Sequence, residues 1–315
     1  MKDFRILITN KCNANCKTCF NKDLRNEDEI EYETFVKVCN YLKNEGGISK
    51  LKIMGGEPTI HPNFLEIYSY AQQCFESVHL FTNGLCKAIE FINPRENDSI
   101  IYNVDCLPLI PKSSRFIIEK PGNRLFETQI YSTCSIESIK KKLYCIKRII
   151  PQDRLGIALT LNCVENIFIH KKEIIEKWNE VSLYIQKDLG IETHVDHGIP
   201  FCFFVGSDLD IKNAKSLCSV KCSGLLTPSL NLQYCNQSSE VLTKINVEGS
   251  FLPFEVIENR LNEFFKRKIS NNLSKICNEC TYFEKKCNGG CFIHKEIISL
   301  ESIKHNSNIP FINKT

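Results

Sequence analysis

The sequence lacks a strong charge of either sign, a long apolar run and an internal repeat. Its 40 Lys and Arg residues nearly balance 37 Asp and Glu, which leaves a net charge of +3. General binders of nucleic acid or membrane surfaces carry a much larger basic excess. The apolar run Phe4–Ile8 is too short for a membrane span or for the core of a signal peptide. We therefore expect a cytoplasmic protein that binds neither nucleic acid nor membranes.

Cysteine departs from this ordinary composition, because the chain contains 18 of them. Disulfide-rich proteins are usually small and secreted, and we expect this 315-residue chain to be neither. Many reduced thiols in a cytoplasmic protein suggest that some of them bind metal.

Short apolar runs alternate with helical patterns over the first two hundred residues. Strands are expected at Phe4–Thr9, Leu51–Met54, Val78–Thr82, Ser99–Val104, Leu155–Leu161 and Ile191–Val195. Helices are expected at Glu33–Glu45, Phe64–Cys74, Ile136–Ile150 and Lys171–Leu189. This alternation is typical of an α/β fold with a parallel sheet. Five or six units favour a partial (β/α)6 TIM-like barrel over a complete eight-fold one.

The pattern changes near residue 208, where short segments around cysteines replace strands and long helices. The sequence predicts a barrel domain at 1–207, a small cysteine-rich domain at 208–297 and a polar tail at 298–315. The second domain includes one amphipathic helix near Glu255–Lys268. Two stretches of the first domain, 93–97 and 106–124, are rich in Pro, Asn and Ser and are expected to be irregular.

Three thiols follow the first strand, at Cys12, Cys16 and Cys19, in the spacing C-x3-C-x2-C. A parallel α/β fold builds its sites at the carboxyl ends of strands, so these thiols are expected there. Three thiolates match a cubane iron-sulfur cluster with one iron left open. The alternative is a zinc knuckle, but structural zinc prefers four protein ligands and no fourth lies nearby.

This spacing resembles the cluster loop of the radical SAM superfamily. Residues 54–58, Met-Gly-Gly-Glu-Pro, follow the second strand and resemble the family's GGE(P) motif. The resemblance implies S-adenosylmethionine (SAM) and a SAM-binding 4Fe–4S cluster as cofactors, and a 5′-deoxyadenosyl radical that removes hydrogen from a substrate C–H bond. The SAM contacts that it implies, with the weaker ones at strand ends last, are Phe20, Gly55, Gly56, Glu57, Pro58, Thr82, Asn83, Asn103 and Asn162.

A second group of cysteines lies near the carboxyl end and resembles the SPASM/Twitch extension of radical SAM enzymes. Its seven members are Cys218, Cys222, Cys235, Cys277, Cys280, Cys287 and Cys291. The resemblance implies one or two auxiliary 4Fe–4S clusters. Two features depart from the pattern: Leu230 replaces a common glycine five positions before Cys235, and no cysteine follows Cys291. A missing ligand would come from His294, His305 or a carboxylate; the alternative to iron-sulfur is a structural zinc site.

A polar segment follows the last expected strand of the barrel and contains candidate catalytic residues. His194, Asp196 and His197 could accept a substrate proton, and Cys202 could return a hydrogen atom to a carbon radical. The alternative is an ordinary loop whose polar groups are satisfied. The catalytic candidates are His197, Asp196 and Cys202.

The SPASM resemblance favours modification of a peptide by crosslinking, epimerisation or oxidation. Against this, the first strand begins at Phe4, which leaves no room for a preceding peptide-recognition domain. The alternatives are oxidation or rearrangement of a small molecule such as an aminosugar, and a metal-binding redox protein that never cleaves SAM. The expected partners are the peptide or small-molecule substrate and a reducing electron donor such as flavodoxin or ferredoxin.

Overall fold

A computed structural model of the chain describes residues 2–16, 19, 21, 25–106, 120–150, 154–161, 169–191, 193–196, 224–235, 238, 240–249 and 251–272. The backbone groups into two compact units. Unit 1 consists of Met1–Phe126, Lys142–Gly156 and Cys222–Phe264, and unit 2 of Glu127–Lys141, Ile157–Lys221 and Phe265–Thr315. The predicted boundary near residue 207 lies outside the described residues and stays a prediction.

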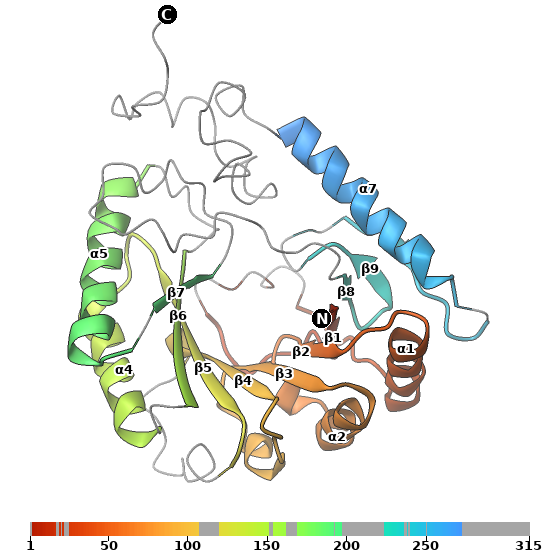
Figure 1. Cartoon of the computed structure of the whole chain (residues 1–315), viewed down its shortest axis with the longest axis horizontal. Helices are drawn as coiled ribbons and strands as arrows, with labels where there is room; N and C mark the ends of the chain where they lie inside the picture. Colours follow the sequence, from red (N-terminus) through yellow and green to blue (C-terminus); the bar gives the residue numbers. More distant parts are fainter. Residues whose placement is uncertain are drawn as a thin grey trace, which may run out of the picture. The chain divides into compact units, whose positions relative to one another are not determined.

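Unit 1 is built on four parallel strands that pair in chain order (Figure 1). These are β1 (Asp3–Leu7), β2 (Lys50–Met54), β3 (Ser77–Thr82) and β4 (Ser99–Asn103). Their register aligns one row of fully buried side chains across the sheet, Ile6, Ile53, Leu80 and Ile100. The alternate positions of β1 and β2 carry the half-buried polar residues Asp3, Arg5, Lys50 and Lys52, so this part of the sheet places its apolar core on one face.

Two helices pack beside each other on one side of β1–β3 (Figure 1). Helix α1 (Tyr32–Asn44) buries Phe35, Val38 and Leu42 along one face, and α2 (Phe64–Cys74) follows β2. Gly47 ends the turn after α1 at a φ of 57°, a left-handed conformation that glycine adopts without strain. The order strand, helix, strand therefore places every β-to-α turn at the carboxyl edge of the sheet.

The carboxyl-terminal part of unit 1 extends this sheet on the other side of β1. Strand β8 (Leu225–Leu226) pairs parallel with β1, β9 (Asn231–Gln233) pairs antiparallel with β8, and β10 (Thr243–Lys244) pairs with β9. Helix α7 (Phe254–Asn272) follows. Its Phe254 packs on Phe4 of β1, with ring centroids 6.5 Å apart.

Strand β5 (Asn123–Ile130) corrects the expectation of irregular structure through residue 124. Its buried residues alternate as Arg124, Phe126, Thr128 and Ile130. Arg124 is only 1% exposed because backbone carbonyls surround its guanidinium, including Gly122 O at 2.9 Å. The period-two pattern was therefore hidden, since two of its four inward positions are polar.

Unit 2 contains the parallel pair formed by residues 157–161 of β6 (Leu155–Leu161) and β7 (Thr193–Asp196), with Leu159 opposite Val195. Helix α5 (Lys171–Leu183) lies between these strands in sequence. Helix α4 (Ile136–Ile149) precedes β6 and belongs to unit 2 only up to Lys141. The predicted helix through Leu189 is α-helical only to Leu183 and continues as a π-helical turn, Tyr184–Asp188. The two units confirm the mainly parallel α/β architecture, and within the described residues no helix is long and apolar enough to cross a membrane.

Candidate active site

The cysteine loop begins directly after β1, at the carboxyl edge of the unit 1 sheet. Its two ends are held together by a short antiparallel contact in which Asn10 N donates to Asp28 O and Ile30 N to Ile8 O, both at 2.9 Å. Thr9 and Glu29 form an isolated bridge between these bonds. The contact closes the segment between residues 10 and 28 into one loop above β1.

Cys12, Cys16 and Cys19 are partly buried thiols on this loop, and none of them forms a disulfide. Burial raises the pKa of the Cys12 thiol. Arg25 forms a side-chain hydrogen bond with Cys19, which raises the pKa of the guanidinium, and interacts electrostatically with Cys12 and Cys16 as well. One cation therefore faces all three thiols.

The three thiols fit a cluster by their chemistry more than by their present spacing. Across the described residues, no three Cys, His, Asp or Glu side chains converge as ligands of a single metal ion. The thiols nevertheless belong to one closed loop, interact electrostatically with one guanidinium and have no competing disulfide. Their assignment as the three metal ligands stays a prediction.

The Gly55–Gly56 pair lies against the backbone that leads into the cysteine loop. Gly56 N donates to Thr9 O at 2.8 Å. A Cβ on Gly56 would lie 2.1 Å from Lys11 O, and one on Gly55 would lie 2.6 Å from Thr9 O. Glycine is required at both positions because two backbones touch there. The motif thus fixes the base of the cysteine loop, and its contact with SAM stays a prediction.

The Glu57 carboxylate is 1% exposed and accepts hydrogen bonds with both oxygens. Its Oε1 accepts from Thr59 N at 3.1 Å, Thr59 Oγ1 at 2.5 Å and Thr82 Oγ1 at 2.8 Å. Its Oε2 accepts from Asn83 N at 2.7 Å. Burial raises the pKa of Glu57, and these donors oppose that shift. We call Glu57, Thr59, Thr82 and Asn83 the carboxylate latch, which joins the ends of β2 and β3.

Asn83 also connects the latch to the cysteine loop. Its Nδ2 donates to Asn13 Oδ1 at 2.7 Å, and its Oδ1 accepts from Leu85 N at 2.9 Å. Pro58 begins a short 3-10 helix, Pro58–Ile60, directly after Glu57. The structure therefore brings Glu57, Pro58, Thr82 and Asn83 together beside the cysteine loop. Glu57 accepts from the Thr82 side chain and from the Asn83 backbone, and the Asn83 side chain reaches Asn13 of the loop.

The remaining predicted SAM contacts are less defined. Asn103 ends β4, and its Oδ1 accepts from Asp105 N at 3.0 Å. Phe20 and Asn162 lie outside the described residues. So do His197 and Cys202 of the catalytic candidates, whereas His194 and Asp196 lie in β7 with undescribed side chains. These assignments stay predictions.

Only Cys235 of the predicted auxiliary ligands is described, and it is buried. It follows β9 by two residues, and β9 runs away from the edge of β1 that carries the cysteine loop. Cys218, Cys222, Cys277, Cys280, Cys287 and Cys291 lie outside the described residues, as do His294 and His305.

The turn before Cys235 contains a leucine, Leu230, in the left-handed backbone conformation that glycine usually adopts. Leu230 has a φ of 63°, the only positive φ at a non-glycine position in the described part of the chain. Its N donates to Thr227 O at 2.9 Å and closes a turn with Pro228 in second position. The position at which the SPASM pattern has glycine is therefore left-handed here, and a leucine bears the strain.

Sequence reasoning missed Asn21 and Arg25, which lie in the same loop as the thiols. The Nδ2 of Asn21 and the Nε and Nη2 of Arg25 are buried and have no hydrogen-bond partner among the described residues. The available signal was weak: a basic residue six positions after Cys19. That the Asn21 and Arg25 donors are buried is visible only in the three-dimensional structure.

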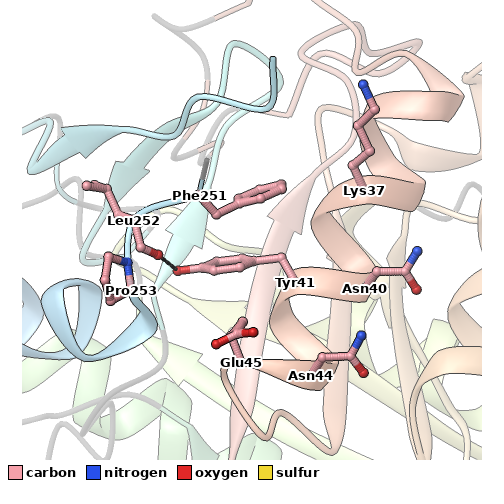
Figure 2. Close-up of a pocket in the computed structure, with 8 residues that line it drawn as sticks. All are labelled: Lys37, Asn40, Tyr41, Asn44, Glu45, Phe251, Leu252 and Pro253. Carbon is pink, nitrogen blue, oxygen red and sulfur yellow. Dashed lines mark hydrogen bonds between the residues drawn. The ribbon is translucent and has the colours of Figure 1, made fainter. Parts of the chain in front are cut away.

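A separate hollow of about 590 Å³ lies beside α1 (Figure 2). Tyr41 forms one wall, stacked on Phe251 at 4.4 Å between ring centroids and donating to Leu252 O at 2.6 Å. No cysteine lines this hollow. The two Tyr41 contacts attach the segment before α7 to α1. The hollow is distinct from the cysteine loop.

Comparison with known sequences gives one family match, the Radical SAM superfamily, over residues 6–105. The chain is 29% identical over 118 residues to a probable GTP 3′,8-cyclase from Methanothermobacter marburgensis, covering 37% of this chain and 38% of that protein. The match therefore spans little more than a third of the length of that curated relative.

Comparison with solved structures gives matches over nearly the whole chain. SuiB from Streptococcus suis, bound to the precursor peptide SuiA, is similar with a TM-score of 0.63 and 13% identity, covering 99% of this chain and 75% of that one. The anSMEcpe structure with bound AdoMet and Cp18Cys peptide has a TM-score of 0.62 and 14% identity, covering 98% and 99%. At such identities the likeness shows a common fold.

Proposed function

Residues 6–105 belong to the radical SAM superfamily, and from this premise we propose that the chain is a radical SAM enzyme that modifies a peptide. Enzymes of this superfamily use SAM and a 4Fe–4S cluster, which together supply a 5′-deoxyadenosyl radical when they are bound. In this chain we assign three cluster ligands to Cys12, Cys16 and Cys19. One iron then stays open for SAM.

The other described residues of the site hold this loop in place. The Gly55–Gly56 backbone and the carboxylate latch fix the loop relative to the ends of β2 and β3. Such a rigid frame supports radical chemistry, since the substrate carbon must be held close to the radical with water excluded. In our proposal, Asp196, His197 and Cys202 complete the site as groups that accept a proton or return a hydrogen atom.

The observation that carries the peptide assignment is the length of the fold match. SuiB and anSMEcpe, both solved with peptides bound, align with 99% and 98% of this chain. That range includes the cysteine-rich carboxyl-terminal part, for which we propose one or two auxiliary 4Fe–4S clusters with Cys235 among the ligands.

A small-molecule substrate is the second candidate, because the sequence relatives include GTP 3′,8-cyclases. Those matches cover about a third of each chain. The alignment therefore leaves most of the chain unmatched. For this reason the small-molecule substrate is the second candidate.

The test is formation of 5′-deoxyadenosine from SAM by the full chain after anaerobic reconstitution with iron and sulfide. Dithionite supplies the electron, and defined synthetic peptides, GTP and an aminosugar are offered in separate reactions. We expect 5′-deoxyadenosine together with a mass change in a peptide. Conversion of GTP or the aminosugar would overturn the peptide assignment, and no product above the Cys12/Cys16/Cys19→Ala control would overturn the enzyme assignment.

A further inference from the structure

The cysteine loop contains three buried nitrogen atoms whose N–H groups have no acceptor among the described residues. Asn21 is 2% exposed, and its Nδ2 has no hydrogen-bond partner within the described residues. The same holds for Nε and Nη2 of Arg25, whose side chain also contacts Cys19. Buried donors are almost always satisfied in native proteins, so three in one loop indicate an absent acceptor.

The fold holds these donors toward the thiols. Asn26, the residue after Arg25, accepts from Asn10 Nδ2 at 2.9 Å and donates to Asp28 Oδ2 at 2.9 Å. These bonds fix the backbone of Arg25 against the strand end that precedes Cys12. Arg25 consequently interacts with Cys12, Cys16 and Cys19 together.

A second described cation of the loop, Lys11, has different neighbours. Lys11 Nζ lies 2.9 Å from Glu29 Oε2 and 3.2 Å from Glu27 Oε2. Its charge is therefore paired with carboxylates. Arg25 interacts with the thiols instead and has Nε and Nη2 unpaired among the described residues, so Lys11 and Arg25 differ in the acceptors that they face.

An acceptor for this set must be anionic, must lie among three cysteines and must take several N–H groups at once. The sulfur atoms of a cysteine-held iron-sulfur cluster have these properties, and N–H···S contacts are among the levers that set cluster potentials. We propose that Arg25 and Asn21 donate to the sulfur atoms of the SAM-binding cluster, and that the Arg25 charge raises its reduction potential.

This inference rests on the proposed function, because it requires a cluster on Cys12, Cys16 and Cys19. A positive charge stabilises the more negative reduced cluster, so its removal makes reduction harder. Arg25 is thus a positioning and tuning residue. It acts on the cluster and needs no contact with the substrate.

The experiment is an anaerobic redox titration of the reconstituted full chain, monitored by electron paramagnetic resonance. The signal followed is the one that changes when SAM is added, which separates this cluster from auxiliary ones. We expect Arg25→Gln to lower the reduction equilibrium constant about tenfold, equal to about 59 mV for one electron. Arg25→Lys keeps the charge and is expected to shift the potential less.

Lys11→Gln is the matched control, since it removes one cation from the same loop but from beside carboxylates. It should leave the potential unchanged. An equal shift in Lys11→Gln, or no shift in Arg25→Gln, would overturn the inference. If Arg25→Gln holds no iron at this site, retention of the cluster by Arg25→Lys supports the inference and its loss overturns it.

Failure of the inference is distinguishable from failure of the proposed function. An intact chain that holds no more iron than the Cys12/Cys16/Cys19→Ala variant has no cluster there, and the proposed function fails. If the intact chain holds the cluster and Arg25→Gln has the same reduction potential, the proposed function is retained and only this inference is wrong.

Discussion

At the carboxyl edge of β1–β3, two adjoining groups of buried polar atoms differ in how completely they are paired. In the carboxylate latch, Glu57 accepts four hydrogen bonds from Thr59, Thr82 and Asn83. In the cysteine loop, Asn21 and Arg25 retain three donors without acceptors among the described residues. A buried group with all its partners stabilises the fold, and we assign the unpaired donors beside the three thiols to a cluster.

The largest expected effect comes from Gly56→Ala. This substitution disrupts the backbone contact between Gly56, which precedes the carboxylate latch, and Lys11 at the base of the cysteine loop. The added Cβ would lie 2.1 Å from Lys11 O, a backbone atom that cannot move without displacing the cysteine loop. We expect the free energy of unfolding to fall by about 3 kcal/mol or more. Urea unfolding of the purified variant measures this loss.

Gly249→Ala is the control for that change, since the nearest atom to its Cβ would be 3.5 Å away. It should alter the free energy of unfolding by less than about 0.5 kcal/mol. Equal stability of the two variants would mean that the Gly56 contact does not hold the loop.

Glu57→Ala tests the contribution of the carboxylate latch to stability. It removes the acceptor of four hydrogen bonds and leaves the N–H of Asn83 and the hydroxyl proton of Thr82 buried without an acceptor. We expect a loss of about 2–3 kcal/mol in the free energy of unfolding, measured by urea titration. Glu57→Gln retains one acceptor oxygen and should lose less. A larger loss in Glu57→Gln would contradict the latch.

A half-buried histidine on the same sheet, His79, predicts a pH dependence of stability. Burial, followed by the charges of Lys50 and Lys52, lowers the pKa of His79 from 6.5 to about 4. Between these pKa values His79 is protonated in the unfolded chain and neutral in the folded chain. The free energy of unfolding therefore falls as the pH falls. We expect a loss of roughly 2 kcal/mol between about pH 7 and pH 5 from this group.

Thermal or urea unfolding of the intact chain and of His79→Gln across this range tests the assignment. The variant should lose less stability on acidification than the intact chain. Parallel curves would mean that His79 titrates normally in the folded state.

The smallest expected effect concerns the turn before Cys235. Leu230→Gly relieves a left-handed leucine, and the gain is partly offset by the greater freedom of glycine in the unfolded chain. We expect the free energy of unfolding to rise by about 0.5–1 kcal/mol. Ser229→Gly, one position earlier, should not stabilise. Destabilisation by Leu230→Gly would show that the leucine side chain outweighs its backbone strain.

Periodicity predicted much of the fold, including α2 (Phe64–Cys74) and β6 (Leu155–Leu161) with their observed ends. It missed β5 because an inward Arg124, whose Nη1 donates to Gly122 O, cannot be distinguished in sequence from an exposed one. The motifs placed Cys12–Cys19 and Gly55–Pro58 at one edge of the sheet. Asn21 and Arg25 were beyond such reasoning, since a missing acceptor is visible only in three dimensions.

The measurement that tests the central claim most directly is iron per chain after anaerobic reconstitution, in the intact protein and in the Cys12/Cys16/Cys19→Ala variant. The account predicts that the variant binds about four fewer irons, the content of one cubane cluster. The intact chain should hold about eight or twelve, according to one or two auxiliary clusters. Equal iron in the two proteins would contradict a cluster on the cysteine loop, and with it the radical SAM function proposed for this chain.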